Sequence, residues 1–273
     1  MKRMITTLGV VLAAAVALTS PASANPLDDI KKKGTLTVGV KTDYPPWGTR
    51  DSSGAIIGME PDMAADVAKR LGVKLELVPV VSSNRMQFLQ QGKIDLMIAT
   101  MSDTPERRKV VGIVDPVYYA SGVAIMANKA ANIKSAADLK GKPVCALQGA
   151  FYNNDLQSKY TQQDLVAFKG IPEAEQALLD GRCVGFVYDD VVLVWKKAQE
   201  KKWDNFDVVA LTEWKPVPWG LAVKSEDATG PWGKFMADTV TDWLKSGWLL
   251  DLETKWVGGN TDWLKEATAN AKK

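Results

Sequence analysis

The stretch "LQQGKIDLMIAT", residues 89–100, has a counterpart further along the chain in "LLDGRCVGFVYD", residues 178–189. Each copy has a leucine three residues before a glycine, a basic residue after it, and then the apolar run of a strand. Eight residues beyond the glycine stands a polar residue, Thr100 in one copy and Asp189 in the other. If each copy is a helix, a turn and a strand, these residues end equivalent strands, where open α/β sheets bind ligands. The repeat therefore predicts two similar lobes facing a shared cleft, with a chance match between short patterns as the alternative.

Strand and helix patterns alternate on both sides of this repeat. Apolar or alternating runs predict strands over residues 35–40, 74–80, 94–99, 144–147, 165–168, 185–188 and 208–211. Helical patterns lie between them, over residues 60–72, 84–91, 172–179 and 191–199, after Gly149, and from Pro231 onward. This alternation predicts the α/β class with parallel sheets.

A short helix is predicted directly after the first repeat, in "SDTPERRKV", residues 102–110. Thr104 is a favourable N-cap, and proline at the first helical position with a carboxylate in the first turn supports the start. Arg107 and Arg108 follow at once, where the positive end of the helix dipole disfavours cations by about 0.3 to 1 kcal/mol each. Two such arginines indicate either a functional site or surface charges with a small cost.

The first 24 residues are expected to be a signal peptide. They carry Lys2 and Arg3, an apolar run, and an Ala-x-Ala site ending at Ala24. Cleavage there would leave no cysteine at the new N-terminus, so we expect an exported, soluble protein rather than a lipoprotein. The apolar run is too short to be a good membrane span.

Composition narrows the function further. Loss of Lys2 and Arg3 would leave 32 basic and 32 acidic residues, because residues 1–24 hold no acid, and this balance argues against a nucleic-acid partner. The chain has no histidine, which excludes serine-histidine and cysteine-histidine nucleophile schemes. We expect no cofactor and no metal. The two cysteines, Cys145 and Cys183, favour one disulfide in an oxidising compartment.

Four segments stand in the order expected of one known family: "GTLTVGVKTDYPPW" (34–47), "GMEPDMAADVAKRLG" (58–72), "NRMQFLQQGKIDLMIATMSDTPERRKVVGIVDPVYY" (84–119) and "PWGLAVKSED" (218–227). The chain resembles the periplasmic amino-acid-binding proteins of ABC importers, the family-3 solute-binding proteins. The resemblance implies a two-lobed, type II periplasmic-binding-protein fold in which a hinge closes a ligand cleft. It implies lobe 1 over residues 25–122 and 220–273 and lobe 2 over 123–219, with crossing strands near 118–126 and 218–223. The expected partners are an amino acid and an ABC permease, and the expected state is a monomer.

The resemblance also assigns ligand-binding roles. It gives Arg107 the ligand carboxylate, since a planar guanidinium suits bidentate pairing, and Asp189 the ammonium. Further contacts and the disulfide follow the family pattern, at Thr100, Ser102, Tyr44 and Trp47, and at Cys145–Cys183. Ser82 is expected to line the pocket for the ligand side chain, with an ordinary turn residue as the alternative. Arg108 has no such role and is expected to be a solvated charge. For Trp47 a place in the core remains the alternative.

One departure from the family is expected to matter. Gly149-Ala150-Phe151 stands where the family usually has Gly-Thr-Thr, so a hydroxyl that helps to hold the carboxylate is missing. We expect Phe151 to face the cleft. The alternative places its ring beneath the helix after Gly149.

Other functions stay open at this stage. An enzyme on the same fold, similar to cyclohexadienyl dehydratase, would need a general acid, with Asp189, Asp43 and Glu60 as candidates. A partner of a chemoreceptor is a third class. Lys41, Asp43 and Arg85 could each select a charged ligand side chain or face solvent.

Overall fold

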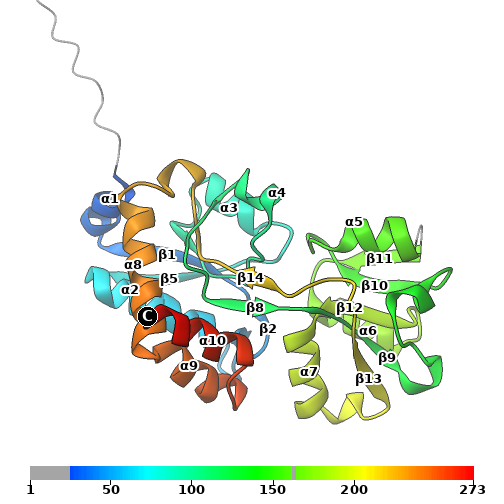
Figure 1. The fold of residues 1–273 in the computed structure, drawn as a ribbon. Helices are drawn as coiled ribbons and strands as arrows, with labels where there is room; N and C mark the ends of the chain where they lie inside the picture. Colours follow the sequence, from blue (N-terminus) through cyan, green and yellow to red (C-terminus); the bar gives the residue numbers. More distant parts are fainter. Residues whose placement is uncertain (1–24, 162–163) are drawn as a thin grey trace, which may run out of the picture.

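The chain forms two α/β lobes joined by a pair of strands in the computed structural model, which describes residues 25–161 and 164–273 (Figure 1). Both ends of the described chain belong to the lobe on the left of Figure 1, here called lobe 1, and the middle of the chain forms lobe 2 on the right. The expected signal peptide, residues 1–24, lies outside the described residues.

Lobe 1 is built on a five-stranded sheet with the order β5-β1-β6-β15-β7. These strands are β5 (Lys74–Pro79), β1 (Thr35–Val40), β6 (Leu96–Met97), β15 (Ala222–Val223) and β7 (Gly112–Ile113). A small sheet of β2 (Asp43–Tyr44), β3 (Gly48–Arg50) and β4 (Ile56–Ile57) lies beside it. The helices of this lobe are α1 (Pro26–Lys33), α2 (Met59–Leu71), α3 (Arg85–Gln90), α4 (Pro105–Arg108), α8 (Pro231–Ser246), α9 (Trp248–Val257) and α10 (Asp262–Ala271).

Lobe 2 repeats the same plan with the order β11-β10-β12-β9-β13. These strands are β11 (Leu165–Phe168), β10 (Val144–Leu147), β12 (Gly185–Asp189), β9 (Val123–Asn128) and β13 (Phe206–Ala210). Its helices are α5 (Asn153–Leu156), α6 (Ile171–Leu179) and α7 (Asp190–Gln199). The predicted α/β class is therefore confirmed, and β6 and β12 of the sequence repeat take the same third place in their sheets.

Each sheet also contains one strand that runs against the others. In lobe 1 this is β15, which pairs antiparallel with β6 and β7, and in lobe 2 it is β9, which pairs antiparallel with β12 and β13. Both follow a strand that crosses from the other lobe, so the chain enters the sheet from the opposite side. The prediction of parallel strands holds for the first three strands of each sheet.

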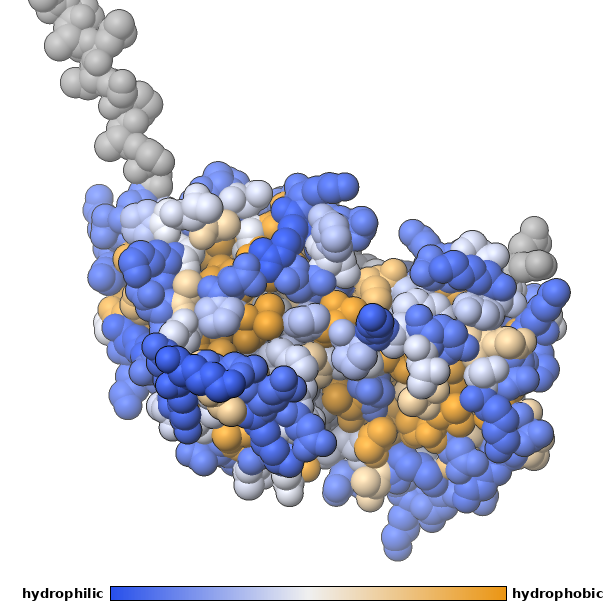
Figure 2. Space-filling view, in the orientation of Figure 1, coloured by the Kyte–Doolittle hydropathy of each residue, from blue (hydrophilic) through white to orange (hydrophobic). Residues whose placement is uncertain are grey.

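The hinge consists of β8 (Tyr119–Ser121) and β14 (Val217–Trp219), paired antiparallel with Tyr119 opposite Trp219 and Ser121 opposite Val217 (Figure 1). The exact division of the chain at residues 122/123 and 219/220 stays a prediction, because the hinge strands connect the two lobes. Polar residues cover the outer surface of both lobes in Figure 2, and hydrophobic ones gather toward the middle of this face.

The predicted disulfide between Cys145 and Cys183 is present and ties β10 to the turn before β12. Buried apolar side chains pack on both sheets and under the helices. Within residues 25–161 and 164–273, no helix has the length and apolar character needed to cross a membrane.

Candidate ligand-binding cleft

A pocket between the lobes brings together residues from both halves of the chain. Lobe 1 contributes Ser82, Arg85, Thr100, Ser102 and Arg107, and lobe 2 contributes Ala150, Phe151, Tyr152, Tyr188 and Asp189. Thr100 and Asp189, the two polar residues of the sequence repeat, are both among them. The carboxyl ends of β6 and β12 therefore face each other across the cleft, as the repeat predicts.

Arg107 lies in the first turn of α4, whose predicted N-cap is present: the Thr104 hydroxyl oxygen accepts a hydrogen bond from the Arg107 amide at 3.3 Å. The guanidinium is buried and donates to two carbonyl oxygens, that of Ser102 at 3.0 Å and that of Gly149 in lobe 2 at 2.9 Å. Burial, together with the charge of Arg85, lowers the pKa of Arg107 to about 9. Arg107 is thus charged at neutral pH and holds only neutral acceptors.

Asp189 is the last residue of β12 and is also buried. Its Oδ2 accepts a hydrogen bond from the Tyr44 hydroxyl of lobe 1 at 2.7 Å. Burial raises the pKa of the Asp189 carboxyl, while Lys41 and the Tyr44 hydrogen bond act against that rise. A carboxyl group that can accept hydrogen bonds from a cation therefore lies in the same pocket as Arg107, and the two residues come from different lobes.

Thr100 is held in a left-handed conformation, with φ of 48°, which is uncommon for a residue with a β-carbon. Its amide donates to Glu60 Oε1 at 2.7 Å, and Arg85 Nη1 donates to its carbonyl oxygen at 2.8 Å. Arg85 also donates to the carbonyl oxygen of Ala99. Two buried ionisable side chains, Glu60 and Arg85, thus fix the backbone where β6 opens into the cleft.

Among the other predicted residues, Ser82, Ser102 and Phe151 line the pocket. Phe151 is half-buried, packs edge-on against Tyr152 with ring centroids 5.1 Å apart, and lies 6.0 Å from the Arg107 guanidinium carbon. Its ring therefore borders the position expected for the ligand carboxylate. Whether Phe151 contacts the ligand stays a prediction.

Tyr44 and Trp47 are placed differently from a simple aromatic wall. Neither lines the pocket, and both are fully buried in an aromatic cluster with Tyr119 and Trp219 of the hinge. Tyr44 reaches the site through its hydroxyl on Asp189. The buried position of Trp47 agrees with the alternative that the sequence left open, a place in the core. A ligand contact for Trp47 remains a prediction.

The cleft is closed, with free space of about 10 Å³ between the lining side chains. Such a volume holds about one water molecule, so a larger molecule can enter only when the lobes separate. Several hydrogen bonds cross the cleft, including those from Arg107 to the Gly149 carbonyl oxygen, from the Tyr44 hydroxyl to Asp189, and from the Ile171 amide to Asp43 Oδ2 at 3.1 Å.

Sequence reasoning did not single out Tyr152 and Tyr188, and it left Arg85 undecided. A signal for Tyr188 exists in the repeat, because it directly precedes Asp189 at the end of the strand. Arg85 is the one cation at the start of an otherwise uncharged helix, "RMQFLQ". Tyr152 carries no local signal, since its place depends on how the two lobes meet.

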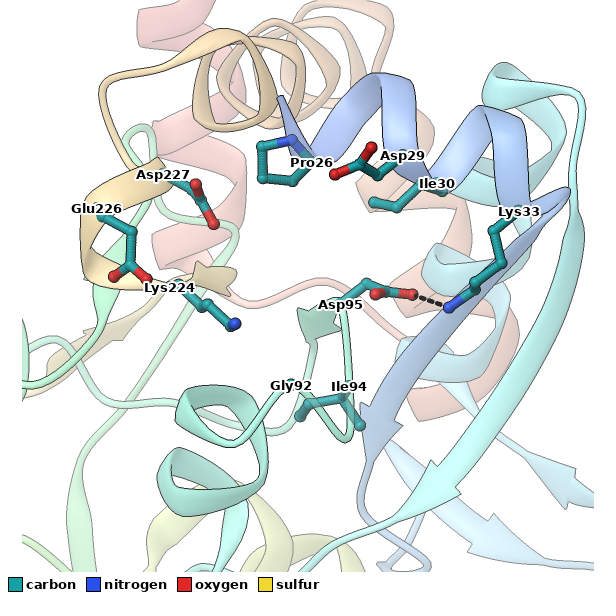
Figure 3. Close-up of a pocket in the computed structure, with 10 residues that line it drawn as sticks. All are labelled: Pro26, Asp29, Ile30, Lys33, Gly92, Ile94, Asp95, Lys224, Glu226 and Asp227. Atoms are coloured by element: carbon teal, nitrogen blue, oxygen red, sulfur yellow. Dashed lines mark hydrogen bonds and ion pairs between the residues drawn. The ribbon is translucent and has the colours of Figure 1, made fainter. Parts of the chain in front are cut away.

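A larger pocket of about 480 Å³ lies elsewhere in lobe 1, between α1 and the segment that joins β15 to α8 (Figure 3). It contains none of the predicted site residues. Lys33 and Asp95 form an ion pair across part of it at 3.0 Å, with the lysine half exposed. Asp29, Lys33 and Glu226 of its lining are exposed, and Lys33 is already paired, so this pocket is not taken as the candidate site.

Fold and site together define a two-lobed α/β protein with a buried, charged pocket between its lobes. The chain belongs to the bacterial extracellular solute-binding proteins, family 3, whose family model matches residues 36–259.

The individual proteins that the chain resembles are consistent with its membership of this family. The chain is 27% identical to the glutamate/aspartate import solute-binding protein of Salmonella typhimurium over 87% of this chain and 81% of the relative. It is 34% identical to the glutamine-binding protein of a Bacillus subtilis ABC transporter over 71% of each. The crystal structure of an ancestral amino acid-binding protein, a precursor of cyclohexadienyl dehydratase, superposes with a TM-score of 0.75 at 31% identity, over 85% of this chain and 99% of that one.

Proposed function

We propose that this protein captures an α-amino acid in the periplasm and delivers it to the permease of an ABC importer, without changing it chemically. The observation that carries the proposal is the meeting of buried Arg107 and buried Asp189 in one interlobe pocket. An α-amino acid presents a carboxylate and an ammonium, and a closed cleft must pair both because unpaired buried charges are costly.

The relatives support this proposal at the level of the ligand backbone. One relative is described as a glutamate/aspartate import protein and another as a glutamine-binding protein. These amino acids share the α-amino and α-carboxylate groups and differ in the side chain. We propose that the protein acts as a monomer, since each chain supplies both walls of its own cleft.

Mass spectrometry of the ligand released from purified protein, with a thermal-shift screen of amino acids, tests the proposal. A true ligand at 100 times its dissociation constant should stabilise the folded protein by about 2.7 kcal/mol. If none of the standard L-amino acids raises the melting temperature or is released from the protein, amino-acid capture is wrong.

The dehydratase alternative is tested separately by incubation with prephenate or arogenate. Of the three carboxyl groups considered for a general acid, Asp189 lines the pocket and already accepts the Tyr44 hydroxyl. Glu60 lies beneath Thr100, and Asp43 accepts from a backbone amide. We expect both compounds to be recovered unchanged.

A further inference from the structure

Three cationic side chains are buried in the closed cleft or directly behind its wall: Lys41, Arg85 and Arg107, with exposed fractions of 1%, 3% and 7%. Among the described residues, none of the three forms an ion pair with a carboxylate within 4 Å. Buried charges are normally paired, because removing a lone ion from water costs several kcal/mol. Arg107 is accounted for by the ligand α-carboxylate, which leaves Lys41 and Arg85.

These two cations hold neutral groups only. Lys41 Nζ donates to the Tyr188 hydroxyl at 2.6 Å and lies over the rings of Tyr44 and Tyr188, 4.6 and 5.3 Å from their centroids. Arg85 donates to backbone carbonyls of the β6 end, and its Nε is buried without a hydrogen-bond partner. Neither arrangement neutralises the charge.

The nearby anions do not balance them. Glu60 is fully buried, and its Oε1 is occupied by the Thr100 amide and the Tyr118 hydroxyl. Asp189 is assigned to the ligand ammonium. Asp43 is only half-buried and accepts from the Ile171 amide at the start of α6. A zwitterion bound between Arg107 and Asp189 adds no net charge, so two buried cations remain against Glu60.

We propose that the ligand is an α-amino acid whose side chain ends in a carboxylate, and that Lys41 and Arg85 select that carboxylate. The proposal rests on the proposed function and adds the substrate class.

The geometry gives the carboxylate a defined place. Arg85, Ser82 and Tyr188 all line the pocket, and the Ser82 and Tyr188 hydroxyl oxygens lie 3.4 Å apart. Because Lys41 donates to the Tyr188 oxygen, the hydroxyl proton of Tyr188 is free to be donated to a ligand oxygen. Lys41 then compensates the ligand charge from behind Tyr188, and Arg85 does so from the pocket wall.

Calorimetric titration of the unmodified protein with matched ligands tests the substrate class. L-Glutamate and L-glutamine have nearly the same shape, as do L-aspartate and L-asparagine, but only the acids carry the extra charge. At pH 7 we expect the better acid to bind about 30-fold tighter than its amide, as for truncation of a buried charge pair. An amide that binds as tightly as its acid overturns the proposal while leaving amino-acid capture intact. Failure of every standard amino acid to bind contradicts the proposed function instead.

A variant of Lys41 tests the assigned residue. Lys41→Met removes the charge and keeps most of the apolar stem, and we expect it to reduce the acid-over-amide preference to about threefold or less, whereas Lys41→Arg should retain it. Lys93→Met is the matched control, because Lys93 also lies over an aromatic ring, 4.7 Å from the Phe88 centroid, but is exposed. A Lys41→Met protein that folds and keeps the full preference shows the selection to be wrongly assigned. If it does not fold, the acid-against-amide comparison in the unmodified protein still decides the proposal.

Discussion

At the scale of single residues, Arg107 and Arg108 are neighbours in sequence with opposite environments. Consecutive side chains on a helix point about 100° apart, so one faces the cleft and the other faces solvent. The Arg108 side chain is 39% exposed and forms ion pairs with Asp103 at 2.6 Å and Asp115 at 2.9 Å, and these pairs raise its pKa. Its expected role as a surface charge agrees with this placement.

Alanine at each of these positions should therefore have different effects. Arg107→Ala should weaken amino-acid binding by about 30-fold or more, because it leaves a ligand carboxylate buried without its partner. Arg108→Ala should change affinity little and reduce stability by at most about 1 kcal/mol, as is typical of surface ion pairs. Calorimetry with melting curves on both variants checks this. A larger binding loss for Arg108→Ala would mean that the wrong arginine has been assigned.

The buried carboxyl group of Glu60 should make the stability of the protein depend on pH. Burial raises the pKa of its carboxyl from 4.5 to about 7, against the hydrogen bonds of Tyr118 and Thr100 and the charges of Lys41 and Arg85. The folded state thus holds the Glu60 proton more tightly than the unfolded state. The contribution of Glu60 to the free energy of unfolding therefore falls as pH rises from about 4.5 to about 7, and is constant above that range. The full effect is about 3 kcal/mol.

Urea unfolding of the protein and of Glu60→Gln between about pH 5 and pH 7.5 measures this contribution. Most of this range lies below the titration of Lys41, whose pKa burial lowers to about 8. We expect the unmodified protein to lose stability relative to Glu60→Gln across the range. Parallel curves for the two proteins would show that Glu60 is already ionised at the lower pH.

At the scale of elements, the two lobes solve one packing problem in different ways. The strand registers make Val38 and Leu96 in lobe 1 equivalent to Val144 and Gly185 in lobe 2, so Gly39 corresponds to Cys145 and Ile94 to Cys183. In lobe 1 the Ile94 side chain fills the space beside Gly39, because a β-carbon added to Gly39 would lie only 2.5 Å from Ile94 Cδ1. In lobe 2 the same two positions are joined by the disulfide.

Replacing both cysteines by alanine should therefore destabilise the protein without disturbing the cleft. The bridge closes a separation of 38 residues, and loss of such a bridge costs about 2 to 5 kcal/mol. Urea unfolding with and without reductant checks this: reductant should lower the stability of the unmodified protein to that of the variant and leave the variant unchanged. The ligand affinity of the folded variant should stay within about threefold of that of the unmodified protein, because the ligand binds the folded state, which the variant still forms. A reductant-insensitive unmodified protein would contradict the prediction.

At the scale of the whole molecule, closure depends on how tightly the two lobes approach. Gly149 of lobe 2 has a φ of +82°, and a β-carbon there would lie 2.7 Å from the Ser82 carbonyl oxygen of lobe 1. Gly141 has a similar φ of +70° but nothing within 4 Å. The two glycines share the backbone requirement and differ in the contact across the cleft.

Alanine at these two glycines should separate folding from closure. Both variants should lose about 1 kcal/mol or more of stability, since the left-handed conformation disfavours a side chain. Only Gly149→Ala should also weaken ligand binding, by about tenfold, because the new methyl group opposes the closed state. Calorimetry and melting curves on both proteins measure the two effects. Equal affinities would show that the lobes close less tightly when ligand is bound.

Much of this protein is encoded locally, in patterns that need no knowledge of the fold. The periods of the strands and helices, the Thr104 cap, and the repeat that pairs Thr100 with Asp189 depend on residues close together in the chain. The sequence alone therefore determined the α/β class and the two-lobed plan, and its resemblance to a known family predicted the pair of charges expected at a ligand. It also determined the disulfide, because the chain has two cysteines and no other thiol.

The tertiary structure decided what depends on contacts between distant segments. It placed Trp47 in the hinge cluster rather than on the pocket wall, reversed β9 and β15 in their sheets, and brought Tyr188 over Lys41. Lys41 and Arg85 could each face solvent or a ligand by sequence, and only the fold buries both of them with no ion pair to a carboxylate of the described residues. Charge balance in a closed cleft is set by all the groups that share it, and those groups come from both lobes.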